Sequence, residues 1–248
     1  MRAAIFVFVA CTPPPKVPVP HDCANRVLQV GDDTLYVDLR GDAAETIVFE
    51  AGFGNDSTVW ADIRTQFPRT FVYDRAGMGK STIGNEPYSL EHDATNLLAA
   101  LDQCHVTGPI IMVGHSYGGA IALEAARDPR ITAIVLLEAM VPGIDMSADI
   151  AKMKAEYDEI RRAAPALAKV AIPWAEALPD TLHALETVHP GQPIIDVIAD
   201  HGQTAWRPAH ERFVAAAPNR ELRVVTSSHK IPHDAPGAVV DAIRASTH

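Results

Sequence analysis

The sequence lacks the residue clusters by which proteins bind nucleic acid or a structural metal ion. Its 21 lysine and arginine residues are outnumbered by 31 aspartate and glutamate residues, the formal net charge is −10, and the basic residues do not cluster. A phosphate-binding face needs such a cluster, so we predict no nucleic-acid partner and a small-molecule substrate. The three cysteines form no CxxC pair and no HExxH motif is present, so we predict no metal site.

The composition also gives no sign of disorder or of a repeat array. Hydrophobic residues make up 48% and charged residues 21% of the 248 residues. That is enough apolar material for one large core, so we expect one α/β domain.

The first residues resemble a bacterial lipoprotein signal. Arg2 precedes a short apolar run over residues 3–10, and Cys11 and a proline-rich segment follow. In such signals the apolar segment is removed and the cysteine is lipidated. We therefore predict a signal over 1–11, membrane attachment in a bacterial cell envelope through lipidated Cys11, and a tether over 12–25. The alternative is a first β-strand or a misplaced start codon, with a cytoplasmic protein.

The other two cysteines depend on that prediction. If Cys11 carries a lipid, Cys23 and Cys104 remain as an even pair in an oxidising compartment. We then expect a disulfide between them, whereas in a cytosolic chain both are expected to be buried thiols.

Apolar runs of strand length alternate with helical patterns from residue 26 to the C-terminus. Two alternating segments around Gly31 indicate an antiparallel hairpin. The expected buried parallel strands cover 46–52, 70–77, 109–116, 131–139, 193–200 and 221–228, and the expected helices cover 89–104, 117–127, a stretch after Trp206, and 236–245. This alternation predicts an α/β fold with a doubly wound, mostly parallel sheet over 26–248.

The strand pattern stops over residues from about 140 to 191. The segment reads as helices broken by Pro165, Pro173 and Pro179. We interpret it as a helical insertion between strands that forms a cap.

A glycine-flanked serine stands at the end of one expected strand. Gly114, His115, Ser116, Tyr117 and Gly118 match the pattern GxSxG between an apolar strand and a helix. This is the context of a nucleophile elbow, whose sharp turn projects the serine hydroxyl into a cleft. Ser116 is therefore the predicted nucleophile, and a serine in a glycine-rich packing turn is the alternative.

This stretch and its surroundings resemble the α/β-hydrolase family, in particular its small serine esterase-like members with a short cap. The segments EAGFGNDSTVW and YDRAGMGKS also look like family segments that follow strands. The resemblance implies that the backbone amides of Phe53 and Tyr117 form an oxyanion hole. A tight turn without catalytic meaning is the alternative for the segment AGFG.

A serine needs an imidazole that takes its proton, and the family order places this histidine last. His229 lies in a loop after the strand over 221–228 and looks like the family's catalytic histidine. His233 in the same loop is the competitor. His115 is expected to pack or to orient the turn.

The acid of the triad stays open between two carboxylates. Asp200 lies just after the strand over 193–200, where most relatives place the acid. Glu138 ends the preceding strand and resembles the alternative acid position of haloalkane dehalogenases, and we slightly prefer it. Asp196 lies in mid-strand and is the least favoured. Either acid would accept the imidazole N–H and fix its tautomer.

These residues predict a serine-dependent carboxylic ester hydrolase that forms an acyl-enzyme on Ser116 and needs no cofactor. Met140 and Trp174, at the edge of the cap or within it, could line a pocket for an apolar acyl ester, with core packing as the alternative. Other reactions of the fold remain open, namely perhydrolysis, acyl transfer and carbon–carbon hydrolysis. So does a noncatalytic homologue that only binds a ligand.

Overall fold

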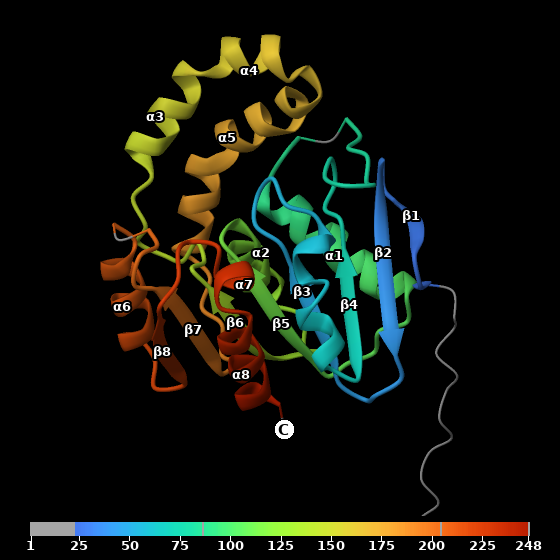
Figure 1. Ribbon diagram of the computed structural model, residues 1–248. Coiled ribbons are helices and arrows are strands. Elements are labelled where there is room, and N and C mark those ends of the chain that lie inside the picture. The colour runs from blue at the N-terminus through green and yellow to red at the C-terminus, as the bar shows by residue number, and fades with distance from the viewer. Residues whose placement is uncertain (1–22, 86, 204, 248) are drawn as a thin grey trace, which may run out of the picture.

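A computed structural model describes residues 23–85, 87–203 and 205–247 and has one central sheet of eight strands (Figure 1). The strands are β1 (Arg26–Val30), β2 (Asp33–Gly41), β3 (Thr46–Glu50), β4 (Arg69–Tyr73), β5 (Ile110–His115), β6 (Ile131–Leu137), β7 (Ile194–Ala199) and β8 (Arg220–Val225). The helices are α1 (Leu90–Gln103), α2 (Tyr117–Ala125), α3 (Ser147–Ala155), α4 (Tyr157–Ala163), α5 (Pro165–Leu185), α6 (Arg207–Ala215), α7 (Ile231–Asp234) and α8 (Pro236–Ser246), with 3₁₀ turns η2 (Ser57–Trp60) and η3 (Ile63–Gln66).

The sheet has the order β1-β2-β4-β3-β5-β6-β7-β8 and is mostly parallel. β1 and β2 form the expected hairpin through Gly31, whose φ of 57° suits glycine. β2 runs antiparallel to β4, and every later pair is parallel. The predicted doubly wound α/β fold is confirmed. Since the parallel strands run in the same direction, the candidate site residues at their carboxyl ends lie together at one end of the sheet.

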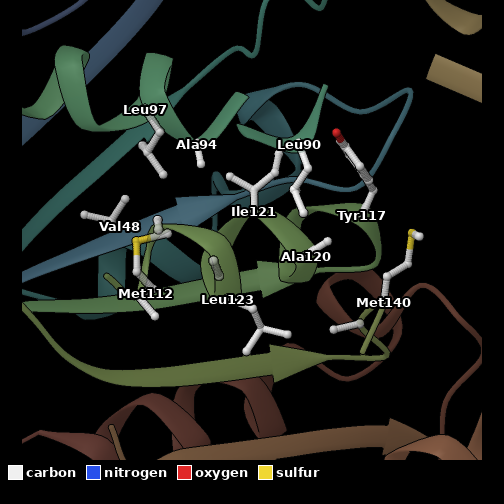
Figure 2. Close-up of a cluster of buried hydrophobic side chains, with 14 of the residues drawn as sticks. Val48, Leu90, Ala94, Leu97, Met112, Tyr117, Ala120, Ile121, Leu123 and Met140 are labelled. Carbon is white, nitrogen blue, oxygen red and sulfur yellow. The ribbon is translucent and has the colours of Figure 1, made fainter. Parts of the chain in front are cut away.

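Alternate residues of the central strands enter two cores on opposite faces of the sheet. Ile110 and Met112 of β5 pack in the core with α1, α2 and α6, whereas Ile111 and Val113 pack in the core with α8. Figure 1 shows α8 in front of the sheet and α1 and α2 behind it. Figure 2 shows the first core, where Ile121 of α2 lies among side chains of α1 and the sheet. Burial on both faces explains why these strands are continuous apolar runs.

Three helices, α3, α4 and α5, lie between β6 and β7 and arch over one end of the sheet (Figure 1). The expected helix breaks are partly wrong. Pro165 starts α5, but Pro173 and Pro179 lie inside this one continuous helix. Each internal proline removes one backbone hydrogen bond, and the burial of Trp174 and Leu178 holds the helix together despite this loss.

A disulfide joins Cys23 to Cys104, the pair expected from the sequence. It ties the chain just ahead of β1 to the C-cap of α1. The predicted signal over 1–11, the lipidation of Cys11 and most of the tether over 12–25 lie outside the described residues and stay predictions. No helix in the part of the chain that the structure describes has the length and apolar character to span a bilayer.

Candidate active site

Ser116 occupies a sharp turn between the end of β5 and the start of α2. Its φ of 54° and ψ of −122° are rare for any residue other than glycine. Backbone hydrogen bonds to both the amide and the carbonyl of Ser116 hold this conformation. The Ser116 amide donates to the carbonyl of Leu137 at 3.1 Å, and the Ser116 carbonyl accepts from the amides of Gly119 at 3.0 Å and Met140 at 2.9 Å.

The flanking glycines let the backbone pass close to its neighbours. A Cβ on Gly118 would lie 2.4 Å from the carbonyl oxygen of Glu50, and a Cβ on Gly114 would lie 2.6 Å from that of Gly118. Both distances are too short for any side chain. The start of α2 therefore packs directly on the end of β3, as a nucleophile elbow requires.

His229 lies beside the Ser116 hydroxyl, with its Nε2 3.1 Å from the Ser116 Oγ. The loop between β8 and α7 carries it, and Trp206 packs edge-on against its ring at a centroid distance of 5.7 Å. Burial lowers the pKa of His229 below the usual value of histidine, and the charge of Glu138 opposes this shift. The neutral imidazole can therefore take a proton from Ser116 near neutral pH. The competitor His233 is exposed and pairs with Asp234 instead.

The two candidate acids occupy different environments. Glu138 is buried after the end of β6, and its carboxylate accepts from the amides of Ala199 and Gln203, both at 2.6 Å. Its charge acts on His229. Asp200 is partly exposed, and its carboxylate accepts from the amide of Ser227 at 3.0 Å. The burial of Glu138 and the effect of its charge on His229 favour it as the acid, and Asp200 secures the segment after β8.

Neither Glu138 nor Asp196 makes a direct hydrogen bond to His229. The Nδ1 of His229 is buried and has no hydrogen-bond partner among the described residues, so Glu138 acts on it through charge and not through direct contact. Asp196, the least favoured acid, lies in β7 and pairs with the Nδ1 of His210 at 2.7 Å. Both members of this pair are fully buried, and because His210 lies on α6, the pair links β7 to α6.

The predicted oxyanion loop lies against the nucleophile. A Cβ on Gly52 would lie 3.2 Å from the Cβ of Ser116 and 2.9 Å from the Nδ1 of His115. Neither the Phe53 amide nor the Tyr117 amide donates a hydrogen bond to another described residue. Tyr117 is the first residue of α2, where helix amides have no partner within the helix. Both amides are thus available to a developing oxyanion.

Trp174 of the cap helix α5 covers this loop. Its ring stacks on that of Phe53 at a centroid distance of 3.8 Å and meets the Tyr117 ring edge-on at 5.7 Å. Met140, by contrast, is 1% exposed and belongs to the core shown in Figure 2. Met140 therefore packs in the core, as the alternative interpretation of the sequence expected. Its predicted role as a pocket residue is not supported.

Two polar arrangements around the site go beyond what the sequence predicted. The Nε2 of His115 donates to the carbonyl of His229 at 2.8 Å, and because burial lowers the pKa of His115 to about 4, the ring is neutral and holds the loop that carries His229. Glu50 and Arg75 form a buried ion pair behind the oxyanion loop. The sequence did contain a signal for this ion pair: Glu50 ends one buried apolar run, and Arg75 closely follows another.

Among the residues that the structure describes, no group of three or more His, Cys, Asp or Glu side chains could hold a metal ion. The groups near Ser116 are the imidazole of His229, the carboxylate of Glu138, whose charge acts on that imidazole, and backbone amides. Such a set suits acid–base and nucleophilic chemistry.

Comparison with known proteins agrees with the observed fold. A family model described as "Alpha/beta hydrolase family" matches residues 47–242. The uncharacterized protein YqjL of Bacillus subtilis is 28% identical over 218 residues, which cover 82% of this chain and 84% of YqjL. The lipase LipV of Mycobacterium tuberculosis is 32% identical over 162 residues, which cover 63% of this chain and 59% of LipV. The solved structure of an esterase from Thermogutta terrifontis matches with a TM-score of 0.66 at 18% identity, over 86% of this chain and 92% of that one.

Proposed function

Because this chain belongs to the alpha/beta hydrolase family, we propose that it is a serine hydrolase that cleaves carboxylic ester bonds through an acyl-enzyme on Ser116. One observation carries the proposal. The Ser116 hydroxyl, on a turn with φ of 54°, lies 3.1 Å from the Nε2 of His229. A strained serine next to a buried imidazole is the arrangement that activates a hydroxyl for attack.

The reaction begins when His229 takes the proton of Ser116 as Oγ attacks the ester carbonyl carbon. The carbonyl oxygen becomes an oxyanion and accepts hydrogen bonds from the amides of Phe53 and Tyr117. As the tetrahedral intermediate collapses, the bond to the alkoxide breaks and His229 gives its proton to the leaving alcohol. Water then attacks the acyl-enzyme with His229 again as base, and the acid and free Ser116 are released.

Glu138 is the proposed acid of the triad. Its negative charge acts on His229 and opposes the effect of burial on the pKa of that ring. The same charge stabilises the imidazolium that forms during both steps. Two backbone amides hold the carboxylate in place.

The environment of the nucleophile supports an apolar acyl group as substrate. The rings of Phe53 and Trp174 stack on one another, and Trp174 also meets the ring of Tyr117, the residue after Ser116. Large apolar side chains favour the burial of hydrocarbon. A serine at the elbow, in place of a carboxylate, argues against epoxide or halide chemistry.

The test compares the wild-type protein with Ser116→Ala in fluorophosphonate labelling and in hydrolysis of p-nitrophenyl esters. We expect the wild type to be labelled and active, and Ser116→Ala to be unlabelled with kcat lower by at least about 10⁴-fold. Ser147→Ala, at an exposed serine of the cap, is the control and should behave as the wild type. A folded wild-type protein that takes up no label would reject the proposal in favour of a ligand-binding homologue.

A further inference from the structure

A buried polar network lies directly behind the oxyanion loop. Glu50 ends β3, Tyr73 ends β4, Arg75 follows β4, Asp93 lies on α1 and Tyr117 starts α2. Each of them is at most 4% exposed. Such an arrangement desolvates one guanidinium and two carboxylates together, which is favourable only when these groups satisfy one another.

Arg75 binds the backbone of the oxyanion loop as well as a carboxylate. Its Nη1 donates to the Glu50 carboxylate and, at 2.8 Å, to the carbonyl of Ala51. Its Nη2 donates to the carbonyl of Gly52 at 3.2 Å. The planar guanidinium therefore donates hydrogen bonds to the carbonyls of two successive peptide groups, a geometry that a lysine ammonium cannot reproduce.

The second of these contacts helps to fix the direction of the Phe53 amide, together with the Asn55 amide, which donates to the same Gly52 carbonyl at 3.2 Å. The carbonyl of Gly52 and the N–H of Phe53 belong to one planar trans peptide, so they point in opposite directions. When Arg75 holds that carbonyl on one side, the N–H is aimed at the other side. A cationic donor on the carbonyl also polarises the peptide and strengthens its N–H as a donor.

The other side of the network reaches the second amide donor. The Tyr117 hydroxyl donates to the Oδ2 of Asp93 at 2.9 Å, and the same oxygen lies 3.9 Å from the Nε of Arg75. The Arg75 guanidinium also lies 5.2 Å from the centre of the Tyr117 ring. Figure 2 shows this side chain extending from the start of α2 beside Leu90 of α1. Anchoring the ring fixes the residue whose amide begins the helix.

We propose that Arg75, with Glu50 and Asp93, positions both amide donors of the oxyanion hole, an inference that rests on the proposed serine hydrolase function. Arg75 is a positioning residue because it acts through the peptide group of Gly52 and the side chain of Tyr117 and does not touch the reacting atoms.

The charges of the network are consistent with this role. Burial works against the charge of Arg75, but the Glu50 carboxylate and its other neighbours more than offset it and hold the pKa of Arg75 well above its usual value. Burial raises the pKa of Glu50 to about 7, and the charge of Arg75 opposes that shift. The guanidinium thus stays charged throughout the range in which an esterase would be assayed.

The test replaces Arg75 with Gln and compares kcat, KM and the affinity of an alkyl trifluoromethyl ketone, whose serine adduct carries an oxyanion. We expect kcat to fall by about 100-fold, with KM changed less than about twofold and the ketone affinity reduced by a similar factor to kcat. The acid limb of the pH profile should stay in place, because His229 is not affected.

Arg64→Gln is the matched control, since Arg64 is also buried and paired, with the Asp38 carboxylate at 2.7 Å, but does not bind the oxyanion loop. It should lose stability and keep its kcat. If Arg75→Gln does not fold, Arg75→Lys and Tyr117→Phe serve instead, with expected losses in kcat of about 30-fold and about fivefold.

A folded Arg75 variant that keeps kcat and ketone affinity within about threefold of an active wild type would overturn this inference alone. A loss of kcat in Arg64→Gln equal to that in Arg75→Gln would also overturn it, because the effect would then be a general loss of stability. An inactive, unlabelled wild type would reject the proposed function itself, so the two failures are distinguishable.

Discussion

At the scale of single residues, the protonation of His229 depends on two opposing influences. Burial favours the neutral ring and lowers its pKa, whereas the charge of Glu138 favours the imidazolium and raises it. A general base must be neutral to act, so activity should persist below neutral pH and fall only when His229 becomes protonated.

Glu138→Gln is expected to remove one of these influences. Without the negative charge the pKa of His229 falls further, so the acid limb of the kcat/KM profile should move to lower pH. At the same time kcat should fall by about 10²–10⁴-fold, because the imidazolium loses the negative charge that stabilises it. A pH series with a p-nitrophenyl ester measures both effects.

Asp200→Asn is the control for this change. Its carboxylate accepts from the amide of Ser227 and does not act on His229, so both the profile and kcat should remain those of the wild type. The reverse result, an inactive Asp200→Asn and an active Glu138→Gln, would assign the acid to Asp200.

The sequence pointed to one candidate nucleophile and one candidate base but not to one acid. Ser116 and His229 stand in contexts typical of those roles, a glycine-flanked turn and a loop before the last helix. Glu138 and Asp200 are carboxylates at the ends of neighbouring strands, and nothing local separates them. The two carboxylates differ in which distant backbone amides they bind, that of Gln203 for Glu138 and that of Ser227 for Asp200. Such contacts form only in the folded molecule.

At the scale of elements, the strands were predictable and the cap was less so. β3, β5, β6 and β7 are continuous apolar runs because both faces of the sheet are covered, and this pattern is visible in the sequence. The course of α5 was not predictable, since it depends on tertiary burial that outweighs the two internal prolines. Local propensity is a weak guide where packing decides.

Trp174 links this cap helix to the oxyanion loop. Trp174→Ala should remove the stack on Phe53 and a buried side chain, which lowers the free energy of unfolding by about 3 kcal/mol. The loop then loses its cover, so kcat/KM should fall by about tenfold. Urea unfolding and ester kinetics measure these two changes.

Trp174→Phe provides the comparison, because it keeps an aromatic ring that can stack on Phe53. It should recover most of the stability and activity. Unchanged kinetics in a folded Trp174→Ala would mean that the cap does not support the loop.

At the scale of the whole molecule, the disulfide closes a long loop. Cys23 and Cys104 are separated by 81 positions, and a cross-link over such a loop restricts the unfolded chain by about 4 kcal/mol in the chain-entropy model. The double variant Cys23→Ser/Cys104→Ser should therefore melt roughly 10 °C lower than the wild type. Thermal unfolding followed by circular dichroism measures the difference.

Cys11→Ser is the matched control, since this cysteine lies outside the bridge, and it should leave the melting temperature unchanged. Equal melting temperatures for the double variant and the wild type, together with titratable thiols at both Cys23 and Cys104 in the denatured wild type, would contradict the disulfide.

The position of that bond also determines how the fold responds to a mechanical pull. Cys23 lies three positions before Arg26, where the edge strand β1 begins, and Cys104 caps a helix of the first core. Tension applied to the chain upstream of Cys23 therefore passes across the sulfur bridge into the body of the domain. The hairpin at the edge of the sheet is therefore spared from being peeled away strand by strand.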